Sequence, residues 1–185
     1  DLWQYSHFRA INFKGYTIVG YSFIPPTPFR LKDWERYDVS RYVDPGCTAP
    51  FEGSHSVDPG EDLEYTNIKQ HLKDLTESLD MSRSVFLFHS PPYKTYLDRA
   101  ALDGQLIEHV PLDVHVGSIA IKEFIEEKQP LLTLHGHIHE STSITGEWKE
   151  MIGNTLCVSA AHDGQELALV QFDIENLGNI KRELL

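Results

Sequence analysis

The sequence predicts an α/β fold in which a mixed β-sheet is flanked by helices. Three observations support this prediction. The apolar runs at residues 84–90 and 131–137 are continuous, as in strands buried on both faces of a sheet. A segment with the apolar spacing of a helix precedes each run. Strand-like segments without intervening helices follow them, which indicates that part of the sheet is antiparallel.

Before these runs, the chain contains one strand and one long loop. Residues 15–22 (GYTIVGYS) are β-branched and aromatic, which predicts a strand. Residues 23–60 are rich in proline and glycine and predict a long loop, which in a compact domain is usually functional or mobile. Its aromatic residues are either anchors for a partner or core residues packed beneath the loop, and we favour core positions for them: Phe23, Phe29, Trp34, Tyr37, Tyr42 and Phe51.

Two segments have the pattern of amphipathic helices. In residues 61–80, apolar residues recur at helical spacing, and acidic residues crowd the first turn, where the helix dipole favours them. Residues 117–130 predict a second helix, with Ser118 as the N-cap and Pro130 marking its end. The remaining strands are expected at 155–160, 167–174 and 179–184.

Charge and composition narrow the classes of function. The 185 residues carry a formal net charge of -12, which disfavours non-specific binding to nucleic acid or to anionic membranes. The chain has no apolar stretch of bilayer length and no signal-peptide pattern. Cys47 and Cys157 lack paired spacing, so we expect free thiols and a cytoplasmic setting. No linker separates two cores, so we expect one domain over residues 1–185.

Both buried strands end in histidine. FLFHSPPY (86–93) places His89 after the first strand, and LLTLHGHIHE (131–140) places His137 and His139 after the second. Functional groups in α/β sheets gather beyond the carboxyl ends of strands, so these three imidazoles are expected to converge. We expect Gly136 to let the backbone turn, and His135 to be a hydrogen-bonding neighbour rather than a ligand.

Converging imidazoles predict a metal site formed by His89, His137 and His139. Neutral imidazole is a common ligand of Mn, Fe and Zn ions. Such an ion would give an acidic protein a positive centre for a phosphate, and it would lower the pKa of bound water.

These two segments resemble the C-terminal motifs of the calcineurin-like metallophosphoesterases. FHSPP (88–92) is similar to the family's lone-histidine block, and GHIH (136–139) matches its GHxH motif. YKTYLD (93–98) and GNTLCVSAAHDG (153–164) are similar to segments that follow these motifs. The resemblance implies an α/β sandwich of two mixed sheets and a di-metal site that hydrolyses phosphate mono- or diesters. It also implies that His89 and His137 bind one metal and His139 the other.

The sequence departs from the family in its first half. It lacks the DxH, GDxxD and GNHD motifs, and DVH at 113–115 stands in the wrong chain order, so we interpret it as a coincidence. We expect the missing motifs to precede Asp1, which would make this chain the C-terminal part of a longer domain. The catalytic and substrate-binding residues are then unknown.

The missing motifs limit what this chain can do alone. Three neutral imidazoles do not offset the repulsion between two divalent ions, so we expect at most one ion, bound weakly, and poor or no hydrolysis. Candidates for a local oxygen ligand are Asp98, Glu140 and Asp163. An apolar sheet face left bare would favour self-association.

Two other functions remain open at this point. The chain could be a non-catalytic binding module that docks a partner through loop 23–60. It could also be a mononuclear metalloenzyme of another class, with the His-x-His pair as in cupin-like barrels, although the alternation of strands and helices argues against a barrel.

Overall fold

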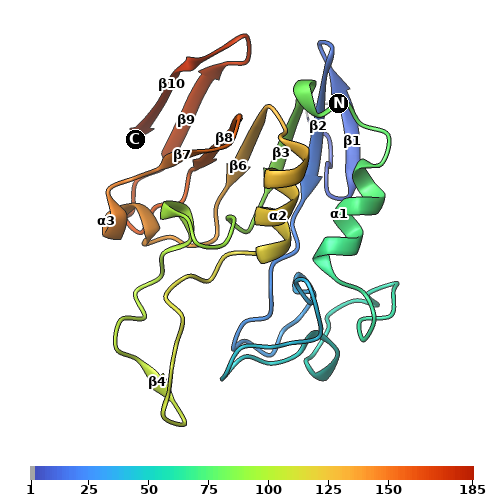
Figure 1. Cartoon of the computed structure of the whole chain (residues 1–185), viewed down its shortest axis with the longest axis vertical. Coiled ribbons are helices and arrows are strands. Elements are labelled where there is room, and N and C mark those ends of the chain that lie inside the picture. Colours follow the sequence, from blue (N-terminus) through green and yellow to red (C-terminus); the bar gives the residue numbers. More distant parts are fainter. Residues whose placement is uncertain (1–2) are drawn as a thin grey trace.

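The computed structural model describes residues 3–185 and is built around a six-stranded sheet with the order β1-β2-β3-β6-β8-β7 (Figure 1). The four inner strands pair in parallel, and the outer strands β1 and β7 pair antiparallel with their neighbours. The predicted mixed α/β sheet is therefore confirmed. The strands span Arg9–Phe13 (β1), Tyr16–Tyr21 (β2), Ser84–Phe88 (β3), Leu132–His135 (β6), Thr155–Ser159 (β8) and Lys149–Ile152 (β7).

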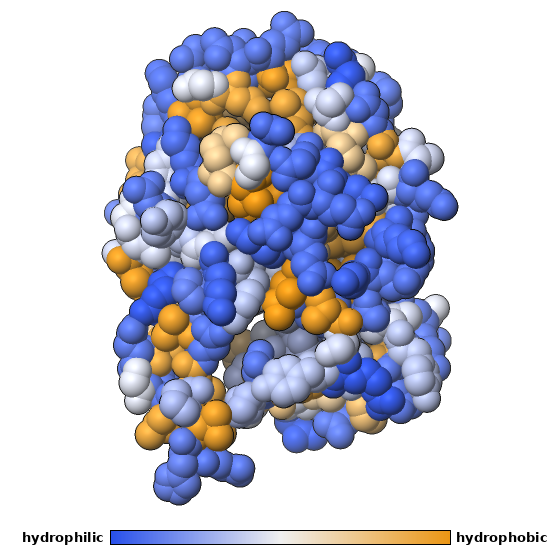
Figure 2. All heavy atoms as spheres, in the orientation of Figure 1, coloured by the Kyte–Doolittle hydropathy of each residue, from blue (hydrophilic) through white to orange (hydrophobic). Residues whose placement is uncertain are grey.

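Two helices, α1 (Ile68–Thr76) and α2 (Ile119–Lys128), cover one face of this sheet (Figure 1). Their apolar sides form a continuous core with the inward side chains of β2 and β3. The outer surface over α2 is mostly hydrophilic (Figure 2). The main residues of this core are Val19, Tyr21, Ile68, Leu72, Phe86, Phe88, Ile121, Phe124 and Ile125.

The opposite face is covered by a two-stranded antiparallel ribbon, β9 (Ala168–Asp173) and β10 (Asn176–Leu184). Ile180 and Val170 of the ribbon belong to a second core with Val85, Leu132 and Val158 of the sheet. The layers are thus helices, sheet and ribbon. The second layer of strands is smaller than the second mixed sheet that the family resemblance implies.

The other elements are short. They are the hairpin β4 (Leu106–Ile107) and β5 (Val110–Pro111), the helix α3 (Ser141–Thr145), and the 3-10 turns η1 (Pro50–Glu52), η2 (Met81–Arg83) and η3 (Tyr96–Asp98). None of the helices in residues 3–185 is long and apolar enough to span a membrane.

The helix predicted over 61–80 is wrong at both ends. α1 begins at Ile68, because the Asn67 side chain accepts a hydrogen bond from the Gln70 amide (2.8 Å) and caps the helix. Glu61 is not part of a first turn, since it binds two basic side chains of the core instead. At the other end, Asp80 caps the turn η2 by accepting from the Ser82 amide (3.0 Å).

The second helix agrees with its prediction. Ser118 is the N-cap and accepts a hydrogen bond from the Ile121 amide (3.0 Å). α2 ends at Lys128, and Gln129 then adopts a left-handed conformation before Pro130. The Asp38 carboxylate strengthens the cap, because it accepts from the Ser118 hydroxyl and from the Ile119 amide.

The predicted loop 23–60 is irregular, but buried ion pairs anchor it. The Lys32 ammonium is 0% exposed and pairs with the Glu35 carboxylate, which also accepts from the Thr27 amide (2.7 Å) and hydroxyl (2.6 Å). The Arg36 guanidinium pairs with Glu61 and lies over the Phe23 ring, 3.9 Å from its centroid. These contacts tie parts of the loop to one another, and Glu61 links them to α1 through His71 (2.8 Å).

The core interpretation of the loop aromatics is right for two residues and wrong for four. Phe23 and Tyr37 are buried, whereas the exposed ones are Phe29, Trp34, Tyr42 and Phe51. The reason is that the space beneath the loop is filled by the buried charged side chains of Lys32, Glu35 and Arg36. Paired charged side chains therefore occupy the positions that we predicted for aromatic rings.

Candidate functional site

The structure brings His89 and His137 together at one edge of the sheet. β3 and β6 are parallel neighbours, so the segments that follow them leave the sheet side by side. The Gly136 amide donates to the His89 carbonyl (3.0 Å) and ties the two segments together. The ring centroids of His89 and His137 are 4.9 Å apart, with an angle of 55° between the rings. This is the edge at which the sequence predicts the site.

His139 lies near this pair but is exposed. Its imidazole lowers the pKa of both His89 and His137, which shows its proximity to both rings. Within residues 3–185, however, no three His, Cys, Asp or Glu side chains are grouped closely enough to hold a metal ion. Two of the three predicted ligands are therefore adjacent, and the third is close without completing a ligand cluster.

The backbone turn in this segment is made by His137 and not by glycine. His137 has a φ of 71°, in the left-handed region that non-glycine residues rarely adopt. Gly136 is not left-handed, and an added Cβ would meet His89 atoms only at ordinary contact distances of 3.8 and 3.9 Å. The predicted role of Gly136 is thus wrong. Such conformations cost free energy and cluster at functional sites.

Both paired imidazoles are neutral near pH 7. Burial, followed by the neighbouring His89 and His139 rings, lowers the pKa of His137 to about 4. Burial of the His89 ring and, after it, the nearby His139 also lower the pKa of His89. A neutral imidazole carries an unprotonated nitrogen, which is the form of histidine that binds metal ions.

The predicted oxygen ligands each accept hydrogen bonds from other groups. Glu140 accepts from the Ala101 amide (3.2 Å), and Asp163 accepts from the Ser143 hydroxyl (2.7 Å). Both still lie near the histidines, because the charge of Glu140 opposes the lowering of the His137 pKa, and the Ser143 hydrogen bond and, more weakly, His139 lower the pKa of Asp163. Asp98 is completely buried in a network of its own, described below.

His135 has the role that the sequence predicts, a hydrogen-bonding neighbour. Its ring is buried and stacks on Phe88 at 5.6 Å between centroids. Nδ1–H donates to the Ser90 carbonyl (2.9 Å), so Nε2 is the unprotonated nitrogen that accepts from the Thr133 hydroxyl (2.8 Å). His135 thereby ties β6 to the segment after His89.

Acidification is expected to destabilise the protein through His135. Burial lowers the pKa of His135 to about 4 from the ordinary value of 6.5, so the unfolded chain binds this proton first. The contribution of His135 to stability is fully present above pH 6.5, and about 3 kcal/mol of it is lost as the pH drops to 4. Urea unfolding at several pH values measures the slope. In the His135→Gln variant the slope should be smaller, and an unchanged slope would contradict this assignment.

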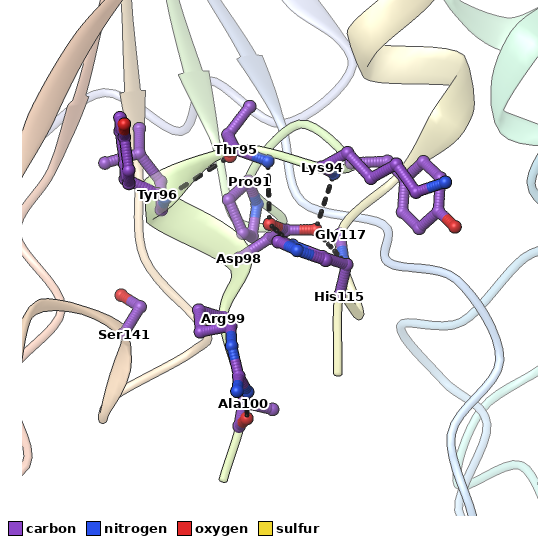
Figure 3. A network of polar contacts seen from close by, with 12 residues as sticks. Pro91, Lys94, Thr95, Tyr96, Asp98, Arg99, Ala100, His115, Gly117 and Ser141 are labelled. Atoms are coloured by element: carbon purple, nitrogen blue, oxygen red, sulfur yellow. Dashed lines mark hydrogen bonds and ion pairs between the residues drawn. The ribbon is translucent and has the colours of Figure 1, made fainter. Parts of the chain in front are cut away.

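A second cluster near the site is centred on Asp98 (Figure 3). Its carboxylate accepts hydrogen bonds from the amides of Lys94 (3.0 Å), Thr95 (2.9 Å) and Gly117 (3.1 Å), and from Nδ1–H of His115 (2.8 Å). The carboxylate thus joins the start of the loop after His89 to its end before α2.

Sequence reasoning missed this network, although one signal was present. Thr95-x-x-Asp98 has the spacing of a capping box, and both of its hydrogen bonds are formed. DVH at 113–115 has a structural role here. His115 binds Asp98, and Asp113 accepts from the Tyr93 hydroxyl (2.5 Å). An added Cβ on Gly117 would lie 2.7 Å from the Pro91 carbonyl oxygen, so only glycine fits there.

Comparisons with known proteins bear on the fold alone. No protein-family model matches the sequence, and no curated protein is similar to it. One solved structure aligns with 97% of this chain at a TM-score of 0.57 and 18% identity, over 53% of its own length. Another, of TT1561 of Thermus thermophilus, aligns with 96% of this chain at a TM-score of 0.47 and 20% identity, over 57% of its own length.

This chain therefore spans about half the length of the solved structures that it matches. The first of them shows that a similar α/β fold occurs as part of a larger protein.

Proposed function

We propose that this chain is part of a metal-dependent phosphoesterase domain, in which His89, His137 and His139 supply imidazole ligands for Mn, Fe or Zn. The observation that carries the proposal is the proximity of His89 and His137 at the carboxyl ends of two parallel strands. Their ring centroids are 4.9 Å apart. Both rings are neutral, and His137 has an unfavourable backbone conformation, which supports a functional role. The similarity of FHSPP and GHIH to calcineurin-like metallophosphoesterase motifs points to the same chemistry.

The chain's own contribution is to hold the imidazoles in place. His135 and the Gly136 amide fasten the two histidine-bearing segments to each other. A bound ion would supply a positive centre for a phosphate and lower the pKa of a bound water molecule. The substrate we propose is a phosphorylated small molecule or a phosphodiester, because the net charge of -12 opposes long nucleic acids.

Metal binding tests this proposal directly. We expect titration calorimetry with Zn²⁺ or Mn²⁺ to show weak binding of at most one ion per chain, since three neutral imidazoles do not offset the repulsion between two divalent ions. His89→Gln and His137→Gln should each abolish saturable binding. His109→Asn is the matched control, because His109 is exposed and asparagine tolerates its φ of 70°. Equal binding by all variants would overturn the assignment.

Turnover of p-nitrophenyl phosphate separates the ligand assignment from activity. We expect this chain alone to show little or no metal-dependent turnover. Rapid turnover that is lost in His137→Gln would support the metal-ligand assignment. It would contradict only the expectation that this chain alone is inactive. Turnover that persists in His137→Gln would place the chemistry elsewhere.

The alternative is a non-catalytic binding module. The exposure of Phe29, Trp34, Tyr42 and Phe51 on loop 23–60 favours it, because exposed aromatic side chains are common anchors of interfaces. The open sheet of the described residues, with β1 and β7 at its edges, excludes a cupin-like barrel as the setting of the third alternative, a mononuclear metalloenzyme.

We also propose that copies of the chain self-associate. The ribbon β9–β10 packs on β3, β6 and β8, and it leaves apolar side chains of Ile11, Phe13 and Ile18 on the same face incompletely covered near the edge strand β1. Antiparallel pairing of two β1 strands would remove the free edge of the sheet and place these side chains beside those of the second copy. Sedimentation velocity at increasing concentration tests this proposal, and a monomer at all concentrations would contradict it.

The proposed location is the cytoplasm. Cys47 and Cys157 are both free, as expected, and burial raises the pKa of the Cys157 thiol to about 12. A protonated, buried thiol of this kind is unreactive.

A further inference from the structure

A patch of aromatic and acidic side chains lies on the irregular segment between β2 and α1. This segment forms the lower right part of the molecule in Figure 1, and its surface there is mainly hydrophilic with intermediate residues interspersed (Figure 2). Three stretches far apart in the segment meet around the guanidinium of Arg41. The group lies 5.5 Å from the Tyr65 ring centroid and 6.0 Å from that of Phe51, and it donates to Glu64 (2.7 Å).

The rings of this patch keep free surface despite that contact. Tyr65 is 70% exposed, Tyr42 is 69% exposed and Phe51 is 44% exposed. We call Arg41, Phe51, Glu64 and Tyr65, together with their exposed neighbours in the sequence Tyr42, Glu52 and Asp62, the Arg41 patch. Isolated exposed aromatics need no explanation, but two aromatic rings beside one guanidinium that also pairs with the Glu64 carboxylate form a specific chemical surface.

The patch has an excess of negative charge. Lys32 and Arg36 are paired inside the domain with Glu35 and Glu61 and do not compensate it. The remaining exposed acidic residues of the segment are Asp44, Glu52, Asp58 and Asp62, against the exposed Arg30 and Arg41. A partner that complements this surface must therefore be cationic and must offer flat groups to aromatic rings.

Arginine meets both requirements, and the structure already contains the pattern. Guanidinium groups stack on aromatic faces and pair with carboxylates, whereas lysine offers a compact, strongly hydrated charge. Arg41 makes this combination of contacts with Tyr65, Phe51 and Glu64. The Arg36 guanidinium repeats it in the core, between Phe23 and Glu61.

The segment is also prepared for binding. The Lys32 amide donates to the Ser54 carbonyl (2.8 Å), the Ser54 amide donates to the Arg30 carbonyl (2.7 Å), and the buried ion pairs lie beneath. A surface that is ordered in advance loses little conformational entropy on binding.

We infer that the Arg41 patch is a docking surface for an arginine-bearing segment of a partner protein. It is distinct from the histidine site, and it does not depend on the proposed phosphoesterase activity. A partner arginine would stack on the free faces of Tyr42, Phe51 or Tyr65 and pair with Glu52 or Asp62. Arg41 occupies part of the same surface, so it competes with the partner.

The competition by Arg41 provides a sharp test. The probe is a fluorescein-labelled decapeptide of alternating arginine and serine, titrated by fluorescence anisotropy in about 150 mM salt, where long-range attraction is screened. We expect Tyr65→Ala to weaken binding about three- to fivefold and Arg41→Ala to strengthen it. The matched controls are Tyr96→Ala, another exposed tyrosine, and Arg30→Ala, which removes the same charge outside the patch.

Several results would overturn the inference. One is the absence of peptide binding, and another is equal binding of the matching lysine–serine peptide, which would indicate attraction to the overall charge of -12 alone. A third is an equal gain in affinity for Arg41→Ala and Arg30→Ala. Binding of a linear oligosaccharide to the patch in place of the arginine peptide would also contradict it. Thermal melting of each variant confirms folding, which these exposed positions should not disturb.

Discussion

Replacing Lys32 with methionine should destabilise the fold by about 3–5 kcal/mol. The substitution removes the charged partner of Glu35 and leaves that carboxylate buried, because both side chains are almost fully shielded from water. The Thr27 amide and hydroxyl still donate to Glu35, but two neutral hydrogen bonds do not replace a positive charge. The free energy of unfolding in urea measures the loss.

A double-mutant cycle isolates the cause of this effect. Lys32→Met combined with Glu35→Gln should be less destabilised than Lys32→Met alone, because no unpaired charge remains and the glutamine oxygen still accepts from Thr27. The control is Lys69→Met. Lys69 pairs with Glu123 at 2.9 Å, but it is 60% exposed, so the loss should be much smaller than for Lys32→Met. Similar losses of unfolding free energy for Lys32→Met and Lys69→Met would show that the buried ion pair contributes no more than the exposed one.

The second large effect is expected for Asp98→Asn, at about 3 kcal/mol. The carboxylate accepts from three backbone amides and from His115, whereas an asparagine oxygen cannot serve all of these donors. The asparagine NH₂ group would also face another donor. Hydrogen exchange should show the amides of Lys94, Thr95 and Gly117 opening before the sheet does.

Asp103→Asn is the control for this substitution. Asp103 lies on the same loop and pairs with Arg99, but its side chain is 72% exposed. We expect a change within about 0.5 kcal/mol. If Asp98→Asn were equally mild, the loop would have to be held by its backbone hydrogen bonds alone.

The inner strands could be predicted because their signal is local. β3 and β6 are shielded on both faces, so their sequences are continuously apolar, and the histidines that follow them mark the carboxyl edge. The edge strands β1 and β7 were not predicted. Most of their side chains reach solvent, and sequences such as KEMI carry no alternation that distinguishes a strand from a loop.

Other features were missed because distant segments decide them. The acidic cluster at 61–64 resembles a first helical turn, but Arg36 and His71 bind Glu61 and leave Asn67 as the helix cap. The Asp98 network likewise joins residues 94–98 to residues 115 and 117, a relation that no local pattern shows. For the histidine site, sequence identified which residues lie at the edge. It did not show that His137 takes the left-handed turn or that Glu140 and Asp163 accept hydrogen bonds from Ala101 and Ser143.

The parallel pairing of β2 with β3 joins Tyr21 to Phe88, two residues separated by the entire irregular segment and α1. The hairpin β1–β2 is thus attached to the rest of the molecule by sheet hydrogen bonds and core packing as well as by the covalent chain. A single protease cut at an exposed tip of the irregular segment would accordingly leave two fragments that remain one particle under native conditions and separate only in denaturant. The β2–β3 pairing and the shared core, and not the covalent connection through residues 23–60, keep the two parts of the molecule together.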